Sequence, residues 1–244
     1  MTSRTERFPV GRLLAEAMLI VFSILLAFGI EAWWAGRGER AAEAEAMAGL
    51  RSDFSENVRR LQEARASHAG IRASALRLLA MTGPAAVQTA PELVMDTLVM
   101  DLISGPKVYP VSGTHDALIA SGRIGILESA ELRRELATWS ATIANLQEAE
   151  REGFVQMDQR LLPFLWDYVP VVTLDLNVLP RYKDVPIARS RFTRRYSDLL
   201  RSRRFENAVE ERMNSSINTL ERFDEAEASA FRVLELLDLE PTAR

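Results

Sequence analysis

The sequence predicts an all-α protein, in which an N-terminal transmembrane helix continues into an elongated antiparallel three-helix bundle with a small helical tip. Alanine, leucine, glutamate and arginine dominate the 244 residues, and these residue types favour helices. One apolar stretch near the N-terminus precedes three long segments whose apolar residues recur at spacings of three and four. Stripes of this kind are buried when helices pack against one another.

The stretch 13–36 is the predicted membrane span, and residues 1–12 form a short tail before it. Residues 17–30 are uncharged and would rise about 21 Å as a helix. A bilayer core is about 30 Å thick, so the span reaches Glu16 and Glu31 at its borders. A cleaved signal peptide is disfavoured because the stretch ends in Glu-Ala-Trp-Trp and not in a small-x-small site. A buried core helix is disfavoured because the stretch is apolar on almost every face.

Two features of the span point to specific roles. Trp33 and Trp34 follow it directly, where aromatic residues anchor a helix at the membrane interface. One stripe of the helix holds small and polar residues, which predicts association with a second copy or another membrane protein. The stripe consists of Glu16, Ser23, Ala27 and Glu31. The alternative, which we favour, places both carboxylates among the lipid headgroups, because an intramembrane charge is costly.

The charges that flank the span bear on its orientation. Arg4, Arg7 and Arg12 precede it, and Arg37 and Arg40 follow it. This excess favours a cytoplasmic N-terminus, so the bundle is expected on the periplasmic side of a bacterial inner membrane. The partners that this implies are the lipid bilayer and, through the span, the protein itself or another membrane protein.

Residues 37–240 are expected to form the bundle. The first long helix, 39–81, is predicted to continue the span, and its apolar stripe holds Met47, Leu50, Phe54, Val58, Leu61, Ile71 and Leu78. The tip, 82–128, is predicted from a break at 82–91, a short helix at 92–103, a loop at 104–113 with two prolines and two glycines, and a short helix from Thr114 that ends at Gly122.

Two more long helices complete the bundle. Ser129 is the predicted N-cap of the second, 130–166. The irregular segment 167–190 follows, and its prolines and β-branched residues predict an extended excursion or a small hairpin at 169–186. The third long helix covers 204–237. If the second helix returns towards the membrane, residues 167–204 lie at the membrane-proximal end of the bundle.

That segment carries a run of arginines. Arg189, Arg191, Arg194 and Arg195 are the predicted contacts to anionic lipid headgroups. The interpretation that ranks first instead pairs the run with acidic bundle faces such as Glu221, Asp224, Glu225 and Glu227. Nucleic acid ranks last, although aromatic residues interleave with the arginines.

The tip holds the only predicted polar site, formed by Tyr109, Thr114, His115 and Asp116. One hypothesis makes it the site of a membrane-bound enzyme or ligand sensor, with His115 as a ligand contact or acid–base group. The favoured interpretation makes Thr114 a cap and His115 a packed side chain. With two histidines and no cysteine, a metal centre is not expected, and no phosphate loop or serine elbow is present. The sequence therefore predicts no cofactor and does not favour an enzyme.

Three segments carry a resemblance: "EAMLIVFSILLAFGIEAWW", "HDALIASGRIGILESAELRRELATW" and "LLRSRRFENAVEERM". Together they resemble an uncharacterised family of bacterial single-span membrane proteins. His115 departs from that pattern, because it stands where an aromatic residue is usual. The resemblance implies a transmembrane helix and a helical bundle, and it implies no catalytic residue. The expected function is that of a membrane-anchored helical scaffold or interaction protein of the inner membrane.

Overall fold

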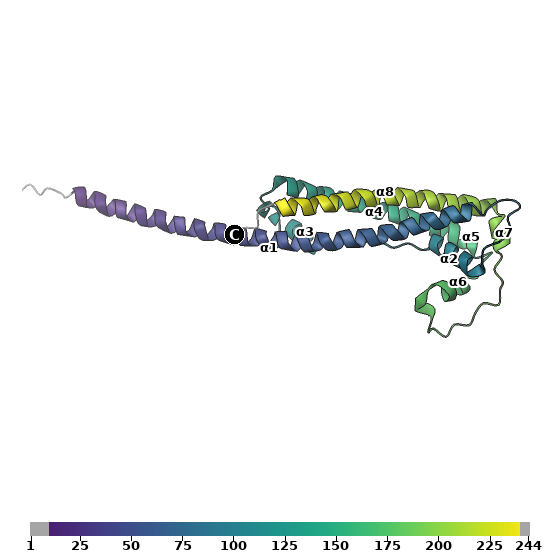
Figure 1. Ribbon diagram of the computed structural model, residues 1–244. Helices are drawn as coiled ribbons and strands as arrows, with labels where there is room; N and C mark the ends of the chain where they lie inside the picture. Colours follow the sequence, from purple (N-terminus) through teal and green to yellow (C-terminus); the bar gives the residue numbers. More distant parts are fainter. Residues whose placement is uncertain (1–9, 240–244) are drawn as a thin grey trace, which may run out of the picture.

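The computed structural model describes the backbone of Val10–Leu239, with the side chains of Glu16 and of residues 18–239. Within these residues every regular element is helical, which confirms the predicted all-α class. The molecule is an elongated bundle from which one helix projects far beyond the others (Figure 1). The side chains of Arg4, Arg7 and Arg12 lie outside the described part.

The projecting helix is α1, Val10–Leu79, which runs without a break for 70 residues. It is long and apolar enough to cross a membrane, judged by length and composition. Its large apolar side chains from Met18 to Trp34 are 50–73% exposed. Burial in the bundle begins further along, at Ala46 and Leu50. We call the end of the bundle near Ala46 the base, and the end near Leu79 the distal end.

The loop 82–91 and helix α2, Glu92–Ile103, lie at the distal end. The amide of Gly83 donates to the carbonyl of Leu200 at 3.0 Å, which ties the loop to the segment before α8. The Ser74 hydroxyl donates to Asp101 at 2.5 Å and ties α2 to α1. Residues 92–103 thus form the predicted short helix.

Residues 104–112, which we call the strap, then lead the chain back to the base. They lie between Asp101, which contacts Ser74, and Thr114, whose amide donates to Asp53 at 2.9 Å. Nine extended residues span about 30 Å, and the helical rise from Asp53 to Ser74 is also about 30 Å. Two prolines keep the strap extended. The predicted loop is therefore a connection along the length of the bundle.

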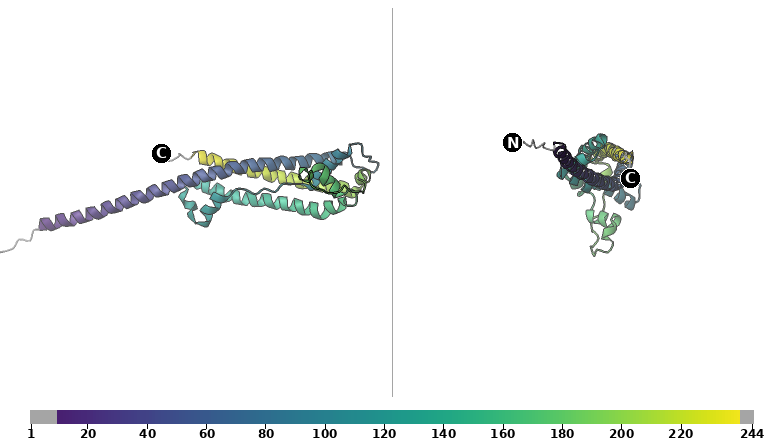
Figure 2. Two further views of the ribbon diagram at one scale, coloured as in Figure 1. Left: turned by 90° about the horizontal axis from the view of Figure 1, so that it is seen from below. Right: turned by 90° about the vertical axis from the view of Figure 1, so that its left-hand side faces the viewer.

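The strap decides the direction of the next long helix. Helix α3, Gly113–Ala120, and the 3₁₀ turn Arg123–Ile126 lie at the base, where the Glu128 amide donates to Glu43 at 2.6 Å. Helix α4, Ala130–Gln156, starts there and runs parallel to α1 (Figures 1 and 2). Ser129 caps α4 as predicted, because its hydroxyl accepts from the Leu132 amide at 3.2 Å.

The expectation that the second long helix returns towards the membrane-proximal end is therefore wrong. The residues of the expected tip, 82–128, are divided between the two ends of the bundle, with α2 at the distal end and α3 at the base. Residues 167–204 consequently lie at the distal end. The physical reason is the strap, which returns the chain to the base before α4 begins.

The distal end is built largely by the segment between α4 and α8. A π-helical turn, Met157–Leu161, and α5, Leu162–Leu165, extend the line of α4. The expected hairpin is helix α6, Val171–Val178, followed by a 3₁₀ turn at Pro180–Tyr182 and by α7, Tyr196–Leu200. Pro170 is suited to a helix start, and burial of Leu174 overrides the strand preference of the β-branched residues.

Helix α8, Arg203–Leu239, completes the bundle and runs antiparallel to both α1 and α4. Asp238 faces Arg51 at the base, and Ser216 faces His68 further along. Buried apolar residues form two separate cores. The core nearer the base holds Leu50, Phe54, Leu136, Trp139 and Phe223 among others, and the distal core holds Leu78, Met95, Leu165, Tyr196 and Phe205 among others.

Candidate functional site

A layer of buried polar side chains separates the two cores. It consists of His68 on α1, Glu150 on α4, and Arg212 and Ser216 on α8, all at most 5% exposed. The Ser216 hydroxyl donates to the carbonyl of His68 at 2.9 Å and so joins α8 to α1. Buried polar groups are costly unless they are hydrogen-bonded, so the partners of each group define what the layer does.

Arg212 holds the start of the strap. Its Nε donates to the carbonyl of Leu102 at 2.9 Å, and its Nη2 donates to the carbonyl of Ser104 at 2.7 Å. These carbonyls end α2, where a cation is also favoured by the helix dipole. Burial lowers the pKa of Arg212 to about 10, so the side chain remains a cation at neutral pH.

Glu150 holds the middle of the strap. Both of its carboxylate oxygens accept from the Val108 amide at 3.2 Å. Burial raises the pKa of Glu150 to about 7, although the Val108 hydrogen bond and the nearby Lys107 oppose that shift. Asn57 and Arg60 of α1 bond the strap further towards the base, at the backbone of Val111 and the carbonyl of Tyr109.

His68 lies between these groups, with the backbone of Pro106 in the strap beside its ring. Its Nε2 is 4.0 Å from Oε1 of Glu150, and its ring lies 5.3 Å from that of Phe223. Burial, together with the charge of Arg212, lowers the pKa of His68 to about 4. At neutral pH the imidazole is therefore uncharged.

Two glycines leave space for the Arg212 side chain in this layer. A Cβ at Gly153 would lie 2.7 Å from the Ser215 hydroxyl and 3.2 Å from Nη1 of Arg212. A Cβ at Gly105 would lie 3.3 Å from Nη2 of Arg212. Backbone and guanidinium thus pack closely at these two positions, and the described residues contain no group of three or more histidines, cysteines or acidic residues that could hold a metal ion. The layer is suited to fixing the strap and the register of the helices.

A second buried polar cluster surrounds Asp96 of α2, which is fully buried. The Tyr196 hydroxyl donates to Asp96, and Asn177 Nδ2 donates to its other oxygen at 2.7 Å. Arg194 pairs with both Asp96 and Glu92, and its Nε is 3.2 Å from Oδ1 of Asp96. Burial and the Asp96 carboxylate raise the pKa of Tyr196, which keeps its hydroxyl protonated. The cluster fastens α6 and the loop before α7 to α2.

The four arginines predicted to contact lipid divide into two groups. Arg194 is only 15% exposed and is turned inward, and Arg189 donates to Oδ1 of Asn177 at 3.2 Å. Arg191 and Arg195 are exposed. The carboxylates that pair with Arg194 belong to α2, whereas the predicted acidic partners Asp224 and Glu227 face Arg65, and Glu225 pairs with Arg222.

The predicted tip residues lie at the base and on the strap. Thr114 packs against Gly49, and its amide is bound by Asp53. His115 is 6% exposed, and its Nδ1 lies 3.5 Å from Asp116, which also accepts from the Ser112 hydroxyl. Tyr109 is 68% exposed on the strap, separated from α3 by the bonds between Val111 and Asn57.

The predicted membrane residues all lie on the projecting part of α1. Glu16, Ser23, Ala27 and Glu31 are exposed, and the Ser23 hydroxyl donates to the Leu19 carbonyl of its own helix at 2.8 Å. The rings of Trp33 and Trp34 meet edge to face at 5.6 Å, and the Arg37 guanidinium lies 5.8 Å from the Trp33 ring centre.

Sequence reasoning did not identify Glu150, Arg212 or Asp96 as important residues. A signal for the first two was present, because each charge lies on the apolar stripe of its helix. Glu150 follows Leu146 by four residues, and Arg212 follows Val209 by three. Comparisons with protein-family models, with curated proteins and with solved structures give no match to this chain.

Proposed function

We propose that this protein is a membrane-anchored helical scaffold or interaction protein of a bacterial inner membrane, with the start of α1 as its single span. One observation carries the proposal: the apolar side chains from Met18 to Trp34 are 50–73% exposed, on a part of α1 that no other described element covers. Exposing a continuous apolar cylinder to water is unfavourable, and a bilayer relieves that cost. Membership of the resembled family remains part of this proposal.

A continuous helical link between span and bundle supports a scaffolding role. Helix α1 contains no proline between Val10 and Leu79, and the same helix forms the span and one long side of the bundle. The twelve residues from Trp34 to Ala46 rise about 18 Å. The span would therefore hold the base close to the membrane and keep the long axis of the bundle pointing away from it.

A partner inside the membrane would use the polar stripe of the span. Glu16, Ser23, Ala27 and Glu31 lie on one side of the exposed helix. Small and polar residues allow helices to approach closely and to bond across the interface. In this proposal the stripe would recognise either a second copy or another membrane protein.

The anchor is tested by extraction of membranes at alkaline pH. The native chain is expected to remain in the membrane pellet, and the triple variant Leu19→Gln, Phe22→Gln, Leu26→Gln is expected to be released. The matched control is Leu76→Gln, Ile119→Gln, Phe231→Gln, which alters three exposed apolar residues of the bundle and should remain in the pellet. Release of the native chain would refute the span.

The orientation of the span is measured separately by cysteine labelling. An introduced thiol is labelled specifically because the native chain contains no cysteine. A Ser140→Cys variant places one thiol on the exposed side of α4. Labelling by a membrane-impermeant maleimide in intact spheroplasts would place the bundle in the periplasm, as we propose. Labelling only after lysis would place the bundle in the cytoplasm.

A further inference from the structure

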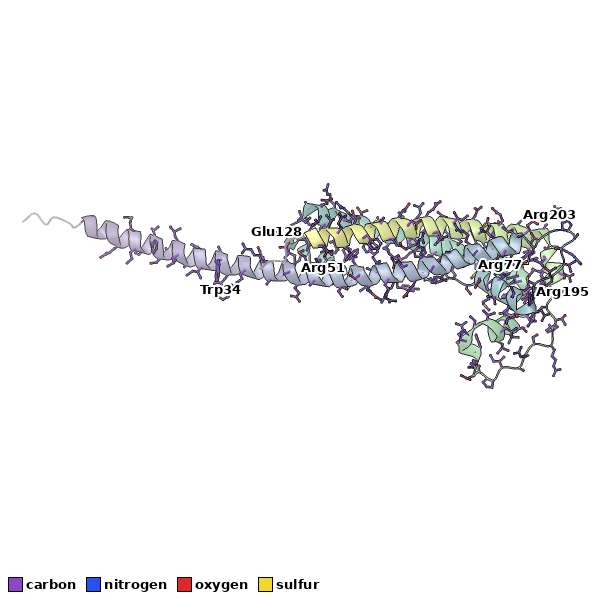
Figure 3. The ribbon with its side chains drawn as sticks, in the orientation of Figure 1. Trp34, Arg51, Arg77, Glu128, Arg195 and Arg203 are labelled. Atoms are coloured by element: carbon purple, nitrogen blue, oxygen red, sulfur yellow. The ribbon has the colours of Figure 1, made fainter. Side chains whose placement is uncertain are left out.

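The distal end concentrates the positive charge of the chain. Residues 166–205 contain nine lysines and arginines against four acidic residues, whereas the whole chain has a formal net charge of −4. The fold gathers this segment at the end of the bundle opposite the projecting helix, where Arg195 and Arg203 are seen (Figure 3). The rest of the chain therefore carries the excess of negative charge.

Much of this charge is not neutralised within the protein. Arg191, Arg201, Arg203 and Arg204 are exposed and form no ion pair within 4.0 Å among the described residues. Arg201 donates to the carbonyl of Ala86, which is uncharged, and Arg204 lies 5.0 Å from the centre of the Phe164 ring. These guanidinium groups keep their charge available to an external anion.

Exposed apolar side chains lie among these arginines. Phe192 is 84% exposed, Trp166 61%, Val87 60% and Leu93 58%. Their neighbours in sequence are bonded to the arginine run: Ala86 to Arg201, Glu92 to Arg194 and the Asp167 carbonyl to Arg195. We call the four apolar residues with Arg191, Arg201, Arg203 and Arg204 the distal surface.

We propose that the distal surface docks onto an anionic lipid bilayer other than the one that holds α1. Cationic side chains near exposed aromatic and aliphatic side chains match a membrane interface, where headgroup phosphates meet acyl chains. Nucleic acid would use the cations and could stack on Phe192. It offers nothing to the aliphatic Val87 and Leu93, so the observations favour lipid.

The length of α1 requires the second bilayer to be a separate one. The helix rises about 68 Å from Trp34 to Leu79. An upright bundle therefore holds the distal surface far from the lipids that surround the span. The inference rests on the proposed function, and it makes the protein a spacer between the bilayer that holds the span and a second, anionic bilayer.

The test uses the full-length protein in donor vesicles of phosphatidylcholine, mixed with labelled acceptor vesicles that contain 30% phosphatidylglycerol. Acceptor capture is read by two-colour coincidence. The native protein is expected to capture anionic acceptors and to ignore pure phosphatidylcholine acceptors. The triple variant Arg191→Gln, Arg203→Gln, Arg204→Gln is expected to lower capture about tenfold or more, because each cation near an anionic surface adds to affinity. Phe192→Ser is expected to lower capture severalfold.

The matched control is Arg59→Gln, Arg123→Gln, Arg134→Gln, which removes the same charge from exposed positions away from the distal surface. It should leave capture within twofold of the native value. Capture at the native level by both the distal triple variant and Phe192→Ser would overturn the proposal. Capture of neutral acceptors as efficient as that of anionic acceptors would also overturn it. Binding of a 20-nucleotide RNA that displaces the acceptors would also overturn it and assign the surface to nucleic acid.

The donor vesicles also separate the two proposals. Alkaline treatment followed by flotation shows whether the protein is inserted, independently of docking. Protein that floats but captures no anionic acceptor leaves the span standing and refutes the distal surface. Protein that does not float refutes the span and, with it, the spacer that depends on the span.

Discussion

The guanidinium of Arg212, buried in α8, donates to the carbonyl of Leu102 at the end of α2 across 2.9 Å. This contact joins two elements that are 110 residues apart in sequence. It fixes the point at which the strap leaves the distal core, and so fixes the path that makes α4 parallel to α1. A buried cation held by carbonyls is expensive to disrupt, because the remaining polar groups lose their partners.

Replacement of Arg212 by Met is therefore expected to destabilise the bundle by about 2–4 kcal/mol, since the Leu102 and Ser104 carbonyls would be left unsatisfied. Thermal unfolding of the full-length protein in neutral detergent, followed by circular dichroism, measures the effect. The matched control is Arg222→Met, which removes an exposed partner of Glu225 and should change stability by less than about 0.5 kcal/mol. Equal melting temperatures for the two variants would contradict the role of Arg212.

Glu150→Gln is expected to make the bundle more stable above pH 7 and to leave it unchanged near pH 4.5. The pKa of Glu150 is raised from 4.5 to about 7, so the folded state holds a proton that the unfolded state releases. Stability of the native chain thus falls as pH rises through that window, by at most about 3 kcal/mol. Glutamine removes this loss and can still accept from the Val108 amide.

His68 changes the stability of the bundle with pH in the opposite direction to Glu150. Its pKa is lowered from 6.5 to about 4, so its contribution to stability is lost as pH falls from 6.5 towards 4. The two effects nearly cancel between pH 4.5 and 6.5 in the native chain, and Glu150→Gln should expose a rise in stability over that range. Melting temperatures from pH 4.5 to 8 test this, with Glu152→Gln as an exposed control on the same helix. A pH-independent difference between Glu150→Gln and the native chain would count against the assignment.

Gly49→Ala is expected to destabilise the base by about 1–3 kcal/mol. Its Cβ would lie 2.7 Å from Oγ1 and 2.9 Å from Cγ2 of Thr114, which forces α3 away from α1. Gly70→Ala on the same helix meets nothing within 4 Å and should stabilise the protein by up to about 1 kcal/mol through helix propensity. Chemical unfolding of both variants measures the two changes in the free energy of unfolding. If Gly49→Ala also stabilised the protein, α3 would have moved away from α1 without a measurable loss of stability.

Tyr196→Phe is expected to lower stability by about 1–3 kcal/mol and to speed proteolysis of the loop between α6 and α7. The change removes one hydrogen bond from the fully buried carboxylate of Asp96. Tyr182→Phe alters a partly exposed ring of the same segment and serves as the control. Trypsin digestion under native conditions reports the loop directly, and identical cleavage rates in the two variants would argue against the Asp96 cluster as its fastening.

The long helices were predictable because their signals are local. Helix α1, the start of α4 at Ser129 and helix α8 follow from apolar spacing, cap residues and helix-forming composition. Helix α6 was not predicted, since the β-branched residues near Thr173 favour strands. The contacts that bury Leu174 against α2 come from a distant part of the chain.

The sequence by itself determined an all-α protein with an exposed apolar helix at its start, because spacing and hydropathy act over one or two helical turns. Tertiary structure alone decided the direction of α4, which arginines bond to other groups within the protein, and where the polar layer forms. Those outcomes depend on backbone groups of the strap finding partners on three helices, as in the bonds of Val108 to Glu150 and of Ser104 to Arg212. Such pairings join residues far apart in sequence, and local pattern does not encode them.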